Sequence, residues 1–221
     1  MKILGAELVT SASTGGPRAG VLRDDLAQFA FAGRSNVGKS SLLNALTRQK
    51  LARTSAAAGK TRQANIFRIS AEGGFGGPGP WSTYLVDLPG YGYARGGDAA
   101  ARELAAVVDA YVAAGLRPKP PQAGRGYIEQ PRRGGMFLLV DSRHPGLPLD
   151  VQAHRWLIQT IAPPRILATK VDKLSQSERA RNLRELERVF GETPLAVSAT
   201  SGEGLEDLWR VVAAVSRSVQ P

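Results

Sequence analysis

The sequence contains no cysteine among its 221 residues. This absence excludes disulfide bonds, thiolate metal sites, cysteine nucleophiles and the lipid anchors that need a thiol. Long apolar runs are missing as well: stretches such as Met136–Val140 are far shorter than the roughly 18 residues of a membrane-spanning helix. Gly5 and Glu7 interrupt the apolar start of the chain, so no secretory signal is expected. We therefore predict neither a disulfide-rich secreted protein nor a membrane-spanning one.

The chain has more basic than acidic residues. It carries 29 lysines and arginines against 19 aspartates and glutamates, a formal net charge of +10. Such an excess favours polyanionic partners, nucleic acid above all, because association releases counterions. The alternative interpretation is a soluble protein that is basic without any such partner. With 221 residues, of which 43% are hydrophobic, the chain is long enough and apolar enough to bury a substantial core.

Short β-rich segments alternate with longer amphipathic ones along the chain. This alternation predicts one three-layer α/β domain with a mostly parallel sheet and helices on both faces. Ligands of such domains lie beyond the carboxyl ends of the strands. The predicted strands are Phe29–Ala32, Asn65–Ser70, Thr83–Asp87, Met136–Asp141, Arg165–Thr169 and Leu195–Ser198. The predicted helices are Lys39–Gln49, Asp98–Ala114, Leu149–Ile161, Gln176–Phe190 and Gly204–Ser218.

Two segments interrupt the pattern. Glu72–Pro80 is rich in glycine and proline, and Leu116–Gly135 adds five basic residues to a similar composition. Both are predicted to be flexible insertions that do not pack well. Residues 1–25 have only a weak β pattern, at Ile3–Thr10, and are predicted to be an N-terminal extension of a single domain at 26–219.

The most informative motif is a glycine-rich loop at residues 33–40. Its sequence, GRSNVGKS, matches GxxxxGK[ST] directly after a predicted strand and directly before a predicted helix. Backbone N–H groups of such a loop surround phosphate oxygens, and the helix N-terminus favours the anion. We expect Lys39 to reach the β- and γ-phosphates and the Ser40 hydroxyl to ligate Mg²⁺. The alternative is a glycine turn that merely opens a helix.

Three further motifs follow predicted strands. Asp87-Leu88-Pro89-Gly90 places a carboxylate near Mg²⁺, through a water, and the Gly90 N–H near the γ-phosphate. Thr169-Lys170-Val171-Asp172 supplies a carboxylate that accepts two hydrogen bonds from guanine but not from adenine, and a lysine stem that covers the base. Val197-Ser198-Ala199 offers a backbone N–H to the guanine carbonyl. The four motifs together predict a guanine-nucleotide site.

The motifs resemble those of the translation-factor-related GTPases of the TrmE-Era-EngA-EngB-Septin-like class. Within that class, the chain resembles the bacterial EngB family, also called YsxC or YihA. The segments that carry the resemblance are 31–46 (FAGRSNVGKSSLLNAL), 59–63 (GKTRQ), 87–94 (DLPGYGYA), 139–150 (LVDSRHPGLPLD) and 169–175 (TKVDKLS). The family usually has proline at position 58, where this chain has alanine.

The resemblance implies a GTP-binding protein that hydrolyses GTP and acts as a switch in assembly of the large ribosomal subunit, with a further role in cell division and septation. It implies Mg²⁺ bound by Ser40 and Thr61, with Asp87 through a water, and contacts of Lys39, Thr61 and Gly90 to the γ-phosphate. The GTP contacts so predicted are Gly33, Arg34, Ser35, Asn36, Val37, Gly38, Lys39, Ser40, Ser41, Gly59, Lys60, Thr61, Asp87, Leu88, Pro89, Gly90, Thr169, Lys170, Val171, Asp172, Val197, Ser198 and Ala199.

The sequence also bears on the rate of hydrolysis. Regulatory GTPases commonly place a water-orienting glutamine directly after Asp-x-x-Gly, where this chain has Tyr91. We therefore predict slow hydrolysis. In related GTPases an asparagine at the position of Asn36 accompanies a K⁺ ion, so Asn36 is either a K⁺ ligand or an ordinary turn residue. Arg95 is either an arginine finger or, more commonly for such an arginine, a solvated or RNA-contacting residue.

The remaining candidates concern partners and packing. The basic residues around the two switch segments (51–63 and 87–97) form either an RNA-facing surface, which we favour, or a solvated face. They are Arg48, Lys50, Arg53, Lys60, Arg62 and Arg95. His144 and His154 have no metal-binding company and are predicted to be structural or interfacial. Trp156 and Trp209 are predicted to lie in the core.

The favoured partner is the large ribosomal subunit or its precursor, bound by a cytoplasmic monomer with no DNA partner and no membrane anchor. The alternative function is an RNA- or membrane-associated regulatory switch that is not tied to the ribosome. GTPase modules for tRNA modification or iron transport normally carry further domains, and a P-loop kinase would lack the guanine-specific motif.

Overall fold

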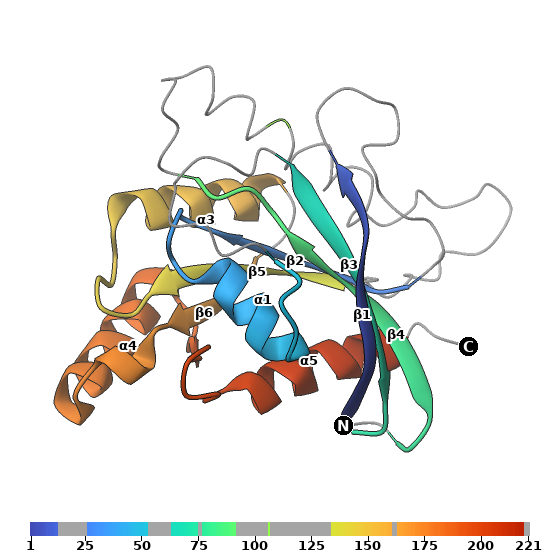
Figure 1. Cartoon of the computed structure of the whole chain (residues 1–221). Coiled ribbons are helices and arrows are strands. Elements are labelled where there is room, and N and C mark those ends of the chain that lie inside the picture. The colour runs from blue at the N-terminus through green and yellow to red at the C-terminus, as the bar shows by residue number, and fades with distance from the viewer. Residues whose placement is uncertain are drawn as a thin grey trace, which may run out of the picture.

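A computed structural model of the chain describes residues 1–12, 26–52, 63–74, 77–91, 106, 134–160 and 163–218. These residues form a seven-stranded sheet flanked by helices (Figure 1). The strands are β1 (Lys2–Ala12), β2 (Gln28–Gly33), β3 (Ala64–Glu72), β4 (Pro80–Asp87), β5 (Gly134–Asp141), β6 (Arg165–Thr169) and β7 (Leu195–Ala196). The helices are α1 (Lys39–Thr47), α3 (Pro148–Thr160), α4 (Gln176–Phe190) and α5 (Leu205–Ser218), with a short 3₁₀ turn, η1, at Val171–Lys173.

The strand order is β1-β3-β4-β2-β5-β6-β7. β4, β2, β5, β6 and β7 run parallel to one another, whereas β3 is antiparallel to both β1 and β4. The predicted mostly parallel α/β sheet is therefore confirmed. β2 is buried along its whole length between β4 and β5. This explains its apolar sequence, since a central parallel strand is covered on both faces.

Two hydrophobic clusters cover the two faces of the sheet. One contains Leu157 of α3 and Leu186 of α4, and the other contains Leu42 of α1 and Trp209 of α5. Trp209 is 6% exposed and donates its indole N–H to the Leu46 carbonyl at 3.1 Å. Its predicted place in the core is confirmed, and Trp156 packs partly buried against the first cluster.

The N-terminal segment, predicted to be an extension of the domain, forms part of its sheet. β1 pairs antiparallel with β3 from Lys2 to Ala12 and forms an edge strand of the same sheet (Figure 1). The weak pattern at Ile3–Thr10 arises because an edge strand needs less apolar sequence than a buried one: Leu4 and Leu8 are about half exposed. Residues 13–25, where the extension would join the domain, lie outside the described residues.

The predicted insertion at 72–80 is the connection of the β3–β4 hairpin, and its described residues do pack. The Arg217 guanidinium of α5 donates to the carbonyls of Gly73, Gly77 and Gly79 at 2.9–3.1 Å. The guanidinium carbon also lies 5.8 Å from the centre of the Trp81 ring. The segment has few side chains that could pack, and its backbone carbonyls bind Arg217 instead.

The predicted insertion at 116–135 ends two residues too late, because Gly134 and Gly135 begin β5 and pair with β2. A Cβ atom at Gly134 would lie 1.9 Å from the Gln28 carbonyl oxygen, so only glycine allows this close approach. The rest of that segment lies outside the described residues, as does the predicted helix at 98–114 apart from residue 106. Across the described part of the chain, none of the helices combines the length and the apolar character needed to cross a membrane.

Candidate functional site

The 33–40 loop connects β2 to α1, as its sequence predicts. A Cβ atom at Gly33 would lie 2.8 Å from the Val37 side chain and 3.1 Å from Leu139, so the loop passes too close to the core for any side chain at this position. Gly38 has φ +107° and caps the start of α1, whose first turn contains no acidic residue. The N-terminal N–H groups of α1 therefore lie where an anion is favoured.

Lys39 and Ser40, the first two residues of α1, converge on Asp87 at the end of β4. The Lys39 ammonium forms an ion pair with one carboxylate oxygen of Asp87. The Ser40 hydroxyl lies 3.4 Å from the other oxygen. Asp87 is 3% exposed. The two predicted motifs thus meet at one point beyond the parallel strands β2 and β4.

The chemistry of these donors fits a hard divalent cation. A hydroxyl and a carboxylate are the oxygen ligands that Mg²⁺ prefers, and it usually keeps several waters besides them. Within the described ranges, no group of three or more His, Asp or Glu side chains forms a ready-made metal cage. Thr61, the other predicted ligand, lies outside the described residues together with Gly59 and Lys60.

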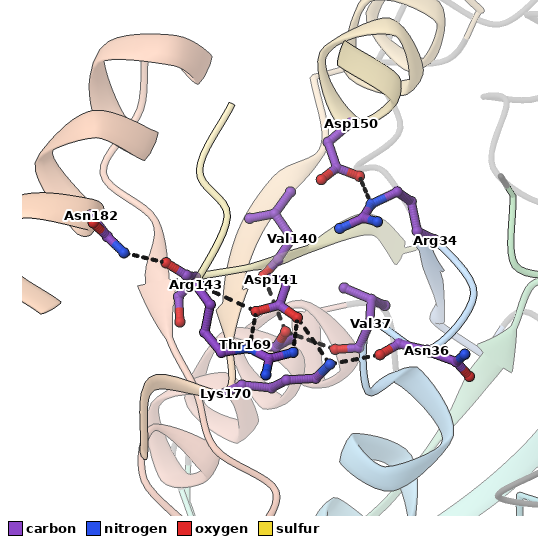
Figure 2. Close-up of polar contacts among 11 residues, drawn as sticks. Arg34, Asn36, Val37, Val140, Asp141, Arg143, Asp150, Thr169, Lys170 and Asn182 are labelled. Carbon is purple, nitrogen blue, oxygen red and sulfur yellow. Dashed lines mark hydrogen bonds and ion pairs between the residues drawn. The ribbon is translucent and has the colours of Figure 1, made fainter. Parts of the chain in front are cut away.

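A second buried carboxylate, Asp141 at the end of β5, joins three parts of the site (Figure 2). It accepts hydrogen bonds from Lys170 Nζ at 2.9 Å and from Arg143 Nε and Nη2 at 2.9 and 2.8 Å. Lys170 Nζ also donates to the Asn36 carbonyl at 2.7 Å. Lys170, which follows β6, is therefore fixed to the 33–40 loop, and the side chain of Asn36 is not used in this contact.

The charge of Asp141 is stabilised by these contacts. Burial alone raises the pKa of its carboxyl, but the hydrogen bonds from Arg143 and Lys170 outweigh burial and hold that pKa well below its usual range. Asp141 is consequently ionised at neutral pH and provides a fixed negative charge between Lys170 and Arg143.

The two remaining predicted motifs also lie side by side. Ser198, which follows β7, donates its hydroxyl to Asp172 Oδ1 at 2.7 Å. This bond holds the pKa of the Asp172 carboxyl below its usual value. The Ser198 oxygen in turn accepts the N–H groups of Thr200 and Ser201 at 3.1 and 3.0 Å. Thr169, at the end of β6, donates to the Val37 carbonyl at 2.8 Å and so ties this end of the site to the 33–40 loop.

The segment after Asp87 is bound to the 33–40 loop through Tyr91. The Ser35 N–H donates to the Tyr91 carbonyl at 2.9 Å, and the Tyr91 N–H donates to the Gly33 carbonyl at 3.3 Å. The Tyr91 hydroxyl donates to Asp150 Oδ1 at 2.9 Å, and Arg34 Nε donates to the same oxygen at 3.0 Å. The residue that replaces the usual glutamine is therefore directed to the start of α3.

The described residues of the four motifs lie at one edge of the sheet, whereas Arg48 and Lys50 follow the C-terminal end of α1. Arg95, Arg53 and Arg62 lie outside the described residues. His144 is exposed, and its backbone N–H donates to the Asp141 backbone carbonyl at 3.0 Å. His154 packs edge-on against Phe190, with 5.0 Å between the ring centres.

Sequence reasoning missed the roles of Asp141, Arg143 and Asp150. Asp141 ends its strand as Asp87 does, which was an available signal. Asp150 gave no comparable signal, because its partners are remote in sequence.

Comparison with known proteins gives the following similarities. A family model described as a 50S ribosome-binding GTPase matches residues 28–170. A Pelotomaculum thermopropionicum protein named "Probable GTP-binding protein EngB" is 40% identical over 222 residues, 96% of each chain. A Solibacter usitatus protein of the same name is 40% identical over 192 residues, 86% of each chain.

Solved structures share the fold at lower identity. The crystal structure of a probable GTP-binding protein engB has a TM-score of 0.57 at 22% identity and covers 87% of this chain and 100% of its own. Era in complex with MgGDPNP and nucleotides 1506-1542 of 16S ribosomal RNA has a TM-score of 0.60 at 18% identity, covering 90% of this chain and 59% of its own. These likenesses establish the α/β fold.

Asp141→Asn is expected to lower the free energy of unfolding by about 1.5–3 kcal/mol at pH 7, the usual contribution of a hydrogen bond to a charged group. Because the folded-state pKa of Asp141 is lowered, its stabilisation is fully present above the unfolded-state pKa of about 3.9 and is lost as the pH falls below it. Urea unfolding of both proteins between pH 7 and pH 3 measures the difference.

Asp207→Asn is the matched control, because Asp207 is an exposed partner of Arg210 in the first turn of α5. We expect this variant to lose less than about 0.5 kcal/mol. Equal losses in the two variants, or a difference for Asp141→Asn that does not shrink below about pH 4, would contradict the role given to Asp141.

Proposed function

The chain belongs to the EngB family of GTP-binding proteins, a family of GTPases, and we propose that it hydrolyses GTP at the loops described above to regulate assembly of the large ribosomal subunit. The observation that carries this proposal is the convergence of Lys39 and Ser40 on Asp87, with Asp172 and Ser198 paired at the same edge of the sheet. The nucleotide would be held by one domain spanning 26–219, to which β1 adds an edge strand.

The phosphates would be held by the 33–40 loop. Its N–H groups and the N-terminus of α1 provide donors for phosphate oxygens, and Lys39 provides a cation. A phosphate would compete with Asp87 for the Lys39 ammonium. Mg²⁺, held by Ser40 and by Thr61 with Asp87 through a water, would stabilise the charge on the transferred phosphoryl group. The Gly90 N–H would contact the γ-phosphate.

Guanine would be recognised by Asp172. A carboxylate there accepts hydrogen bonds from N1–H and the 2-amino group, which adenine does not offer in this arrangement. The bond from Ser198 orients this carboxylate, and the lowered pKa of Asp172 keeps it charged. Lys170, fixed by Asp141 and the Asn36 carbonyl, would cover the face of the base with its stem. The Ala199 N–H would bind the guanine carbonyl.

Asp172→Asn is expected to weaken GDP and GTP binding about a hundredfold or more, because two charge-assisted hydrogen bonds are lost. Xanthine nucleotides should bind the variant better than guanine nucleotides do. Xanthine has a carbonyl oxygen in place of the 2-amino group of guanine, and the amide N–H of the variant can donate to that oxygen. Competition titration with GDP and xanthosine diphosphate measures this exchange. Retained preference for guanine would remove Asp172 from base recognition.

Hydrolysis is proposed to be slow without an activator. The Tyr91 hydroxyl is bonded to Asp150, so the residue after Asp-x-x-Gly offers no amide for orienting water. Electrostatic stabilisation by cations would then provide most of the catalysis.

A K⁺ ion beside the phosphates is part of this proposal, with the exposed side chain of Asn36 as its protein ligand. We expect hydrolysis to be severalfold faster in K⁺ than in Na⁺ buffer of equal ionic strength. We also expect Asn36→Ala to hydrolyse GTP at equal rates in the two buffers. Phosphate release in the two buffers measures both effects, and equal rates for the unmodified protein would exclude the ion.

The proposed partner is the large ribosomal subunit or its precursor. The family model is that of a 50S ribosome-binding GTPase, and the net charge of +10 suits a surface rich in RNA phosphate. Arg48 and Lys50 lie on the surface after α1, next to the first predicted switch segment. A cytoplasmic monomer that acts also in cell division completes the proposal.

Co-sedimentation with large ribosomal subunits tests this function. We expect the protein to pellet with the subunit in the presence of a non-hydrolysable GTP analogue but not GDP, and to do so at moderate as well as low salt. The nucleotide dependence follows if the γ-phosphate orders the surface that meets the subunit. Equal, salt-sensitive binding with both nucleotides would show that charge alone is acting and would contradict a GTP-gated ribosomal partner.

A further inference from the structure

Asp150, in the first turn of α3, is a buried carboxylate outside the four nucleotide motifs. It is 1% exposed. Its Oδ1 accepts both Arg34 Nε and the Tyr91 hydroxyl, at 3.0 and 2.9 Å, and Figure 2 shows the Arg34 contact. Within the described residues, its Oδ2 is buried without a hydrogen-bond partner. Burying a carboxylate with half of its acceptor capacity unused is unfavourable, so its two bonds at Oδ1 are the compensation.

Tyr91 is the donor in its contact with Asp150. Burial and the adjacent negative charge of Asp150 raise the pKa of the Tyr91 hydroxyl far above its usual value, so the hydroxyl keeps its proton. Arg34 supplies the positive charge that compensates the carboxylate. Charge-assisted hydrogen bonds of this kind are stronger than neutral ones.

The same tyrosine fixes the backbone that precedes it. Its N–H and carbonyl both bond to the 33–40 loop, at Gly33 and Ser35. The neighbouring Gly90 lies so close to that loop that a Cβ atom would be 3.1 Å from the Ser35 nitrogen. Gly90 is therefore held between a buried core residue, Leu88, and an anchored Tyr91.

We propose that Asp150 is a positioning residue which, through Tyr91, holds Gly90 against the 33–40 loop and so favours GTP over GDP. This inference rests on the proposed function, in which the Gly90 N–H contacts the γ-phosphate. A group that is already positioned loses little freedom when its ligand binds. Because only GTP has a γ-phosphate, the gain applies to GTP and leaves GDP binding nearly unchanged.

The test is the ratio of the dissociation constants for GDP and for a non-hydrolysable GTP analogue, measured by titration with Mg²⁺ present. Tyr91→Phe removes only the hydroxyl and keeps the ring and the backbone bonds. Asp150→Asn keeps the shape of the side chain and removes its charge. We expect each variant to lower the ratio by about tenfold, corresponding to the loss of one charge-assisted hydrogen bond, with GDP affinity changed less than about twofold.

Two controls separate positioning from general loss of structure. Asp207→Asn makes the same chemical change in the first turn of α5 and should leave the ratio as it is. The double variant Tyr91→Phe/Asp150→Asn should show nearly the ratio of Asp150→Asn alone, because both substitutions act on the same hydrogen bond between Tyr91 and Asp150. If Asp150→Asn does not fold, Tyr91→Phe alone decides, since it leaves the Arg34–Asp150 pair intact.

The outcomes are distinct from those of the proposed function. If the unmodified protein binds neither nucleotide, the proposed function fails before the inference is reached. If it binds both, an unchanged ratio in Tyr91→Phe, equal weakening of GDP and the analogue, or a shift toward the analogue overturns the positioning role.

Discussion

The parallel pairing of β2 with both β4 and β5 is the constraint on which the rest of the structure depends. β2 is buried along its length, and it pairs with β4 as far as Phe31 and with β5 as far as Gly33, so the end of the strand is fixed in space. Three loops then leave the sheet at one edge, and the residues that begin them meet there. The close packing of Gly33 against Val37 and Leu139 shows how little freedom remains at this point.

Buried carboxylates organise the loops at that edge. Asp87, Asp141 and Asp150 are each 3% exposed or less, and each pairs with a cation from a different part of the chain. Such pairs add little to stability compared with apolar packing, because both charges must be desolvated. Their effect is geometric: removing one partner leaves a buried charge uncompensated, so alternative arrangements of the loops are strongly disfavoured. The site therefore obtains a defined shape from charges that contribute little net free energy.

Most of the fold can be predicted from the sequence, because apolar strands such as Met136–Val140 and capped helices such as α4 carry strong local signals. The four motifs can be located in the same way, since each one lies at the end of a predicted strand. The sequence predicts only a weak β pattern for β1, because an edge strand with exposed Leu4 and Leu8 lacks the apolar pattern of a buried strand. The composition of residues 72–80 predicts a segment that does not pack well, yet Arg217 donates hydrogen bonds to its backbone carbonyls. Contacts between residues so distant in sequence, like that of Tyr91 with Asp150, have no local signature.

Tyr91 affects both the orientation of the attacking water and the position of Gly90. An amide there would be short enough to turn toward the phosphates, whereas the longer phenol reaches Asp150 on α3 and cannot do both. Under the proposed function, the chain gives up orientation of the attacking water and gains a fixed Gly90. A protein that must stay in its GTP form while a partner assembles benefits from this combination, since slow hydrolysis prolongs the state that a well-positioned Gly90 helps to recognise. Under that function, slow hydrolysis and selective binding of GTP would follow from the same side chain.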